Sequence, residues 1–206
     1  MNDYIQTLEQ KNIVLIDDFL AETECHELLY ELQFTHWSKS NVVKYIGDER
    51  SPAYFSDMRK SQTAGQIWFS DRLNEKLQNV EHRLAALLST SRQHLEEWQA
   101  TVYGKGDKFD FHVDCGNWQD TKAGERKRTI LLYLDTPLKG GETRFRALNL
   151  TVPAIAGRVL IWNNLLPSGK CNFAMIHAGL PLEEGTKTIL VTWERQRVLK
   201  ETATPL

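Results

Sequence analysis

A histidine and an aspartate two positions apart, His112 and Asp114, end the stretch from Tyr103 to Asp114 and could bind a metal ion. Alternate residues of a β-strand point to the same face, so an imidazole and a carboxylate at this spacing can reach one point in space. A distant histidine, His177, could complete the ligand set. Two histidines and one carboxylate on one side of a metal leave the opposite coordination positions open. The sequence therefore indicates a metal site that can accept further ligands.

The same pair also has a plainer interpretation. A His-x-Asp motif is short, and the chain contains six histidines and many acidic residues. An imidazole that is satisfied by its neighbours beside a surface acid would have the same sequence. The residues downstream must decide between the two interpretations.

A lysine leads one face of a strand expected over residues 188–194. The other residues on the face of Lys187 are apolar: Ile189, Val191 and Trp193. Burying an ammonium group without a counter-ion costs several kcal/mol, so an inward Lys187 should meet a carboxylate. At the start of a strand the same side chain could instead extend to water, and the alternation alone leaves both interpretations open.

Composition excludes some classes of partner. The chain has 206 residues and a mass of 23.8 kDa, which suits one domain with a sizeable core. Its 25 basic and 27 acidic residues give a net charge of −2. This balance gives no electrostatic reason to expect nucleic acid or an anionic membrane as a partner.

The N-terminus and the cysteines predict a soluble cytoplasmic protein. The first residues lack a basic segment followed by an apolar one, and no apolar run approaches membrane-spanning length. The cysteines Cys25, Cys115 and Cys171 are too few and too scattered for a disulfide framework, and their odd count fits a reducing compartment. Cys115 is not expected to be a metal ligand beside Asp114, because adjacent strand residues face opposite ways.

Helices are expected before the strands. Residues 12–17 are typical of a short strand and residues 22–32 of an amphipathic helix, with Thr23 as its N-cap. Residues 38–66 indicate short strands and loops. A second helix should begin at Ser70 or Asp71 and end near Leu88, because leucines and a valine recur at helical spacing.

From about residue 96 the period changes to two, and short strands continue to residue 195. Residues 128–134 predict a central strand with Thr129, Leu131 and Tyr133 on one face. Helices first and strands after indicate an α+β fold in which helices brace a β-sandwich. We expect one domain over residues 1–206, with a helical and strand part over about 1–95 and a core over about 96–197.

At this point the order of motifs resembles a known family, the prolyl 4-hydroxylase-like branch of the Fe(II)/2-oxoglutarate-dependent dioxygenases. The motifs are Tyr-x-x-Gly from Tyr103, His-x-Asp from His112, Arg-x-x-Thr from Arg126, Gly-Gly-Glu-Thr-x-Phe from Gly140, Pro-x-x-x-Gly from Pro153, Asn-Leu at Asn164, His-x-Gly-x-Pro from His177, Gly-x-Lys ending at Lys187, and Trp193. An Arg-x-Ser element at Arg59 extends the similarity upstream. The fold implied is a double-stranded β-helix, or jelly roll, braced by N-terminal helices.

The resemblance implies roles for these residues. His112, Asp114 and His177 would ligate Fe(II), and Lys187 would pair with the distal carboxylate of 2-oxoglutarate. The remaining candidates for contact with 2-oxoglutarate are Tyr103, Thr143, Tyr133 and Trp193. Ascorbate is a further cofactor that the resemblance admits.

Three residues are candidate substrate contacts: Arg59, Arg126 and Trp118. The arginines match positions near the peptide substrate of this branch, although a solvated arginine is the plainer interpretation of each. Phe109 stands where many relatives have tyrosine, so one hydroxyl is missing there. The polar segment 116–127, which carries Trp118, is either a mobile lid over the metal or an ordinary surface loop.

The implied reaction consumes O2 and 2-oxoglutarate, releases succinate and CO2, and hydroxylates a C–H bond. The retained carboxylate of Asp114 favours hydroxylation, since related halogenating enzymes lack it. The substrate would be a peptidyl proline or a related peptide. The alternatives are a free amino acid or small metabolite, and, in another class, a non-catalytic metal-binding jelly roll. Nucleic acid and membrane are not expected as partners.

Overall fold

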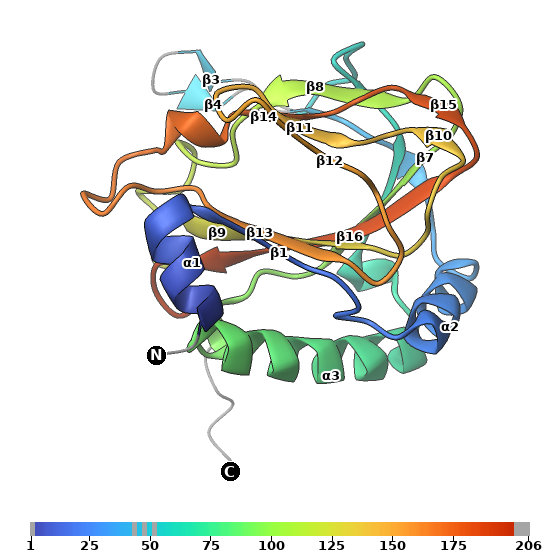
Figure 1. Ribbon diagram of the computed structural model, residues 1–206, viewed down its shortest axis with the longest axis horizontal. Helices are drawn as coiled ribbons and strands as arrows, with labels where there is room; N and C mark the ends of the chain where they lie inside the picture. The colour runs from blue at the N-terminus through green and yellow to red at the C-terminus, as the bar shows by residue number, and fades with distance from the viewer. Residues whose placement is uncertain (1–2, 43–44, 47–48, 51–52, 200–206) are drawn as a thin grey trace.

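A larger and a smaller β-sheet lie face to face in the computed structural model, which describes residues 3–42, 45–46, 49–50 and 53–199 (Figure 1). Across the larger sheet the strands are β1 (Ile13–Ile16), β13 (Val159–Asn163), β9 (Arg126–Tyr133), β16 (Lys187–Arg195), β7 (Gln99–Tyr103), β6 (Gln62–Gly65) and β2 (Ser38–Lys39). Across the smaller sheet they are β12 (Leu150–Val152), β11 (Thr143–Phe145), β14 (His177–Gly179), β8 (Lys108–His112) and β5 (Arg59–Lys60). The strand pairs within both sheets are antiparallel, and the arrangement is the expected jelly roll.

Short ribbons and helices complete the fold. The ribbons pair β3 (Tyr45–Ile46) with β4 (Glu49–Arg50) and β10 (Lys139–Gly140) with β15 (Leu182–Glu184). The α-helices are α1 (Asp3–Lys11), α2 (Glu22–Leu32) and α3 (Asp71–Leu88), and short 3-10 helices cover Gln66–Trp68, Arg92–His94 and Phe173–Met175. Among the residues described, no helix has the length and apolar character that a bilayer crossing requires.

The two long predicted helices are confirmed, but one predicted cap is wrong. Ser70 caps α3 by accepting a hydrogen bond from the amide of Leu73 at 3.1 Å. Helix α2 begins one residue before Thr23, so this threonine lies inside the first turn. Its N-cap is Ala21, whose amide donates to the carboxylate of Glu24 at 2.9 Å. The carboxylate of Glu24, at the third helical position, therefore caps the helix in place of the hydroxyl of Thr23.

Helices α2 and α3 cover the outer face of the larger sheet (Figure 1). The leucine row of α3 is buried there against alternate residues of β9, including Ile130 and Leu132. The intervening residues Leu131 and Tyr133 face the smaller sheet and belong to a second core between the sheets. The predicted alternation of β9 is thus confirmed, and the larger sheet is apolar on both faces.

The N-terminal part of the chain supplies strands to both sheets. Strand β1 pairs with β13, and β6 pairs with β7 at the other side of the larger sheet. Strand β5 pairs with β8 in the smaller sheet. The jelly roll therefore begins well before residue 96, and β5 brings Arg59 next to the strand that carries His112.

The cysteines differ from the expectation of a reducing compartment. Cys115 and Cys171 form a disulfide with their Cα atoms 5.8 Å apart, and Cys25 is free and buried. The two partners are 56 residues apart in sequence, so neither count nor spacing indicates the pair. The fold brings them together and links the segment after β8 to the one before β14.

Candidate metal centre

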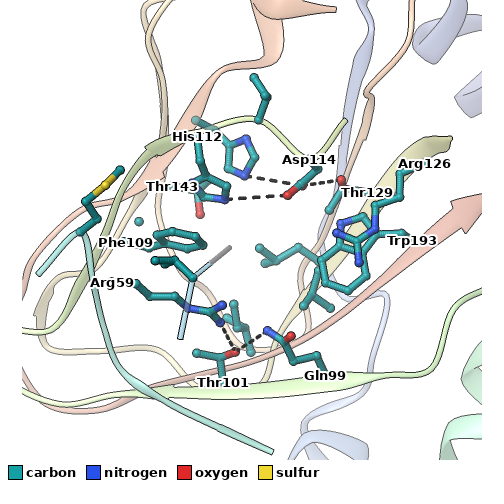
Figure 2. A pocket seen from close by; sticks show the side chains of 18 of the residues that line it. Arg59, Gln99, Thr101, Phe109, His112, Asp114, Arg126, Thr129, Thr143 and Trp193 are labelled. Atoms are coloured by element: carbon teal, nitrogen blue, oxygen red, sulfur yellow. Dashed lines mark hydrogen bonds and ion pairs between the residues drawn. The ribbon is translucent and has the colours of Figure 1, made fainter. Parts of the chain in front are cut away.

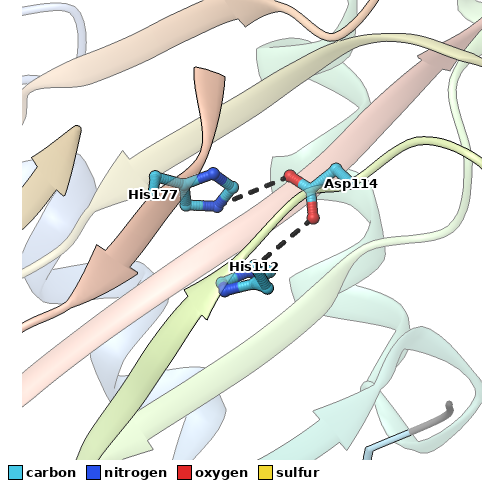
Figure 3. Close-up of side chains that lie close together, drawn as sticks. All are labelled: His112, Asp114 and His177. Atoms are coloured by element: carbon cyan, nitrogen blue, oxygen red, sulfur yellow. Dashed lines mark ion pairs between the residues drawn. The ribbon is translucent and has the colours of Figure 1, made fainter. Parts of the chain in front are cut away.

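The three expected metal ligands converge between the sheets (Figure 3). His112 ends β8, His177 begins β14, and the two residues are directly paired across these antiparallel strands. Asp114 follows two residues after His112, and its carboxylate lies 3.8 Å from Nε2 of His112 and 3.7 Å from Nε2 of His177. One ligand atom from each residue lies within 4.8 Å of the others, so the group could hold a metal ion.

Hydrogen bonds fix how each ligand is presented. Nδ1 of His112 donates to the carbonyl of Asp110 at 2.8 Å, and Nδ1 of His177 donates to that of Met175 at 3.0 Å. Because a carbonyl can only accept, the proton sits on Nδ1 and the lone pair of each Nε2 faces the centre. Thr129 Oγ1 donates to Asp114 Oδ2 at 2.7 Å, which orients the carboxylate.

Electrostatics also favour metal binding. Burial lowers the pKa of His112, and the neighbouring His177 lowers it further. Burial opposes ionisation of Asp114, but His177, His112 and Arg126 together with the hydrogen bond from Thr129 hold the pKa of this carboxyl below its usual value. The lowered pKa values of His112 and Asp114 favour a neutral imidazole and an ionised carboxylate, and both are donors that a divalent metal requires.

The ligands open into a cavity of about 510 Å³ between the sheets (Figure 2). Its wall includes ten of the residues that sequence analysis selected: Arg59, Tyr103, His112, Asp114, Trp118, Arg126, Thr143, His177, Lys187 and Trp193. Tyr133 is fully buried behind this wall and is not part of it. Its hydroxyl is 2.7 Å from Oγ1 of Thr143, so it orients Thr143.

Lys187 points inward, and the alternative in which it extends to water is wrong. The residue is 2% exposed, and Nζ donates to the carbonyl of Gly141 at 2.6 Å. Burial lowers its pKa to about 8, although Glu142 and Asp135 act in the opposite direction. No described carboxylate forms an ion pair with it, so a buried ammonium faces the cavity without a counter-ion.

Arg126 is not a solvated arginine. Its guanidinium makes two hydrogen bonds to Glu96, at 2.8 and 2.7 Å. It also lies 3.5 Å above the ring of Trp193 and 4.9 Å from that of Trp118. The charge of Arg126 is thus matched within the protein, and its planar group forms part of an aromatic cavity wall.

Arg59 lies across the cavity from the metal ligands, against the ring of Phe109 at 4.7 Å (Figure 2). Its hydrogen-bond acceptors are neutral: the carbonyl of Asn41 and the hydroxyls of Thr63 and Thr101, at 3.2–3.4 Å. Its Nε is buried without a partner in the described structure. These contacts favour the substrate-contact interpretation of Arg59 over the solvated one.

Segment 116–127 is anchored at several points. One carboxylate oxygen of the buried Glu125 accepts from the amides of Gly116 and Trp118, at 2.9 and 3.0 Å. Arg195 donates to the carbonyl of Gly124, and the disulfide fixes Cys115 directly before the segment. These contacts favour the interpretation of a fixed wall over that of a mobile lid.

Several functional side chains were missed in the sequence analysis. Thr129 orients Asp114, Glu96 holds Arg126, and Gln99 and Thr101 line the cavity near Arg59. Thr129 was detectable, because it is the polar residue on an otherwise apolar inward face of β9. Glu96 was not, because its partner is 30 residues away and no local pattern joins them.

Comparisons with known proteins agree with this site. Residues 98–195 match the family described as the 2OG-Fe(II) oxygenase superfamily. Prolyl 4-hydroxylase subunit alpha-3 of Homo sapiens is 30% identical over 188 residues, covering 88% of this chain and 33% of that protein. The alpha-1 subunit of Gallus gallus is 26% identical over 195 residues, covering 92% and 36%. The chain thus spans about a third of the length of these curated relatives.

Solved structures show the same fold. A viral collagen prolyl hydroxylase from Paramecium Bursaria Chlorella virus-1 aligns with a TM-score of 0.64 at 22% identity, covering 90% of this chain and 96% of that one. A prolyl hydroxylase from Trichoplax adhaerens, solved with a hypoxia inducible factor peptide fragment, aligns with a TM-score of 0.68 at 17% identity, covering 93% and 87%. Residues 98–195 belong to the 2OG-Fe(II) oxygenase superfamily. Within that superfamily the chain is similar to the prolyl 4-hydroxylases.

Proposed function

We propose that the chain is an Fe(II)- and 2-oxoglutarate-dependent dioxygenase that hydroxylates a C–H bond of a peptidyl proline or a related peptide. One observation carries the proposal: three metal-ligand side chains and a buried, unpaired lysine open into the same cavity. A dianionic cosubstrate bound in this cavity would supply a ligand for the metal and a counter-ion for Lys187. When bound, Fe(II) and 2-oxoglutarate would supply the oxygen activation and the oxidising equivalents for hydroxylation.

The residues of the chain would hold, orient and shield these groups. His112, Asp114 and His177 would bind the metal from one side and leave the positions that face the cavity open. Lys187 would pair with the distal carboxylate, and Thr143 would donate a hydrogen bond to it. Tyr103 and Trp193 would line the cosubstrate space and exclude water from it.

Turnover of 2-oxoglutarate tests this proposal. The purified chain, incubated with Fe(II), O2 and 2-oxoglutarate, should release succinate and CO2, and Asp114→Ala should abolish this release. A proline-containing peptide set should stimulate succinate release, and mass spectrometry should find a gain of one oxygen on proline. Ascorbate, proposed here as an auxiliary reductant, should prolong turnover without being required for the first one.

Two other functions make different predictions in turnover and binding assays. Stimulation by free amino acids or small metabolites, but not by peptides, would identify a small-molecule hydroxylase. Tight metal binding with no binding of 2-oxoglutarate would identify a non-catalytic metal module. Lys187, which has no counter-ion among the described residues, favours the enzyme, because a metal-binding module has no use for a buried ammonium that lines the cavity.

The boundaries and location of the protein are also proposals. We infer that residues 1–206 act as one domain, because β1 and β6 from the N-terminal part pair with β13 and β7 of the core. Limited proteolysis should then yield no stable fragment that begins near residue 96. A cytoplasmic location stays a prediction, and the Cys115–Cys171 disulfide removes the cysteine argument for it. Cell fractionation would test the location, and thiol labelling of the same fractions would test the disulfide.

A further inference from the structure

Two arginines of the cavity wall differ in how their charges are matched. Arg126 has short hydrogen bonds to the carboxylate of Glu96, at 2.8 and 2.7 Å. Arg59 has bonds of 3.2–3.4 Å to neutral oxygens, longer than the usual 2.9–3.0 Å, and no described carboxylate forms an ion pair with it. A partly buried guanidinium with only long contacts to neutral oxygens lacks a counter-charge.

The cosubstrate does not complete this arrangement. In the loaded site, the charges of Fe(II), Asp114, Lys187 and the 2-oxoglutarate dianion would cancel one another. Arg59 would then keep an unmatched positive charge in the space left for the primary substrate. Its Nε is buried and lacks a hydrogen-bond partner among the described residues, so the guanidinium is short of hydrogen bonds as well as of a counter-charge.

The surroundings of Arg59 suit a planar anion. The ring of Phe109 lies against one face of the guanidinium and cannot accept a hydrogen bond in its plane. Thr101 Oγ1 accepts from Arg59 Nη2 at 3.4 Å and from Gln99 Nε2 at 3.3 Å. Gln99 thus provides a second, neutral donor next to the cation, and both side chains line the cavity.

We propose that the primary substrate presents a carboxylate to Arg59, with Gln99 as a further hydrogen-bond donor to it. The inference rests on the proposed dioxygenase function and adds the chemical class of its substrate. A carboxylate matches the guanidinium fork in both geometry and charge. It can come from an acidic side chain near the target residue of a peptide, or from the free carboxylate of an amino acid or small metabolite.

Matched ligand pairs test the charge requirement directly. One set contains capped tetrapeptides with proline beside glutamate and their counterparts with glutamine, and the second pair is L-proline and L-prolinamide. Binding is measured by calorimetry under argon, with the chain loaded with Fe(II) and 2-oxoglutarate. In at least one pair, the carboxylate member should bind about tenfold more tightly than its amide counterpart. The pair that shows this preference identifies the source of the carboxylate.

Substitutions assign the preference to Arg59. Arg59→Gln should reduce it to less than about twofold, whereas Arg59→Lys should retain a part of it. Arg146→Gln is the matched control, because this exposed arginine lies 4.0 Å over the ring of Phe111, which is on the same strand as Phe109, and does not line the cavity. Melting temperatures show whether each variant is folded. If Arg59→Gln does not fold, the reduced preference of Arg59→Lys still tests the role of Arg59.

The proposal is overturned if neither pair shows a preference for the carboxylate, or if Arg59→Gln retains the full preference. The proposed function fails separately, when the wild-type chain releases no succinate in an iron-dependent reaction. A carboxylate preference that depends on Arg59 in a chain without such turnover would therefore support the binding site and refute the dioxygenase. The two failures have different readouts and can be told apart.

Discussion

The hydroxyl of Thr129 controls the direction in which the Asp114 carboxylate points. It donates to Oδ2 of Asp114 and accepts from Nδ2 of Asn164 at 2.8 Å. Thr129→Val keeps the side-chain shape and removes both bonds, so metal affinity should fall about tenfold or more. Anaerobic calorimetric titration with Fe(II) measures this change. Thr129→Ser, which keeps the hydroxyl, should bind metal almost as well as the wild type, and equal affinities for the valine and serine variants would contradict this role.

Lys187 should make 2-oxoglutarate binding depend on pH. Its pKa is lowered to about 8 by burial, so the free site loses the ammonium charge as the pH rises through this value. Binding requires the charged form, and the dissociation constant should therefore be flat below pH 7 and rise about tenfold between pH 7 and pH 9. Titrations with the Fe(II)-loaded chain under argon would measure it. Lys187→Arg stays charged, so its affinity should not change over this range.

The lowered pKa of Lys187 affects the free energy of unfolding in the opposite direction to cosubstrate binding as the pH rises. The unfolded chain, where Lys187 has an ordinary pKa, binds the proton more tightly than the folded chain does. The contribution of Lys187 to the free energy of unfolding thus rises as the pH increases from about 8 towards the ordinary lysine value. Weaker cosubstrate binding at high pH is therefore not a sign of a less stable protein.

At the scale of elements, the segment between β8 and β9 is held by one carboxylate. Glu125 is buried and accepts from the amides of Gly116, Trp118 and Arg126. Glu125→Ala would leave these amides without their acceptor, and should lower the free energy of unfolding by about 2–4 kcal/mol. Urea denaturation measures the loss, and hydrogen exchange should become faster in this segment. Asp120→Ala, an exposed acid in the same segment, should change neither quantity.

The elements that could be predicted are those with a periodic apolar face. Helix α3 has both a leucine row and a hydroxyl cap, and its bounds followed from the sequence. Helix α1 was missed because it is short and has few apolar residues, of which Leu8 alone is fully buried. Alternation put Lys187 on an apolar face but left open whether its side chain turns inward or extends to water. No local pattern could pair Cys115 with Cys171 or Arg126 with Glu96. Such partners are set by how the sheets fold over each other.

On the scale of the whole molecule, the larger sheet separates two cores with different roles. The outer core, between this sheet and the helices, contains Leu84 of α3 and lies on the side away from the cavity. The inner core, between the sheets, contains Phe145 and Trp162, whose ring centroids lie 5.6 and 4.6 Å from that of His177. Stability should therefore depend on both cores, and metal affinity on the inner one.

Matched core substitutions test this division. Leu84→Ala and Phe145→Ala each remove a fully buried side chain, and each should lower the free energy of unfolding by about 2–5 kcal/mol in urea denaturation. Phe145→Ala should also weaken Fe(II) binding, because it leaves space beside His177 and frees the imidazole to rotate. Leu84→Ala should bind Fe(II) like the wild type while the chain is folded. If both variants lost metal affinity equally, the sheet would not insulate the site from the helices, and stability and metal binding would form one cooperative unit.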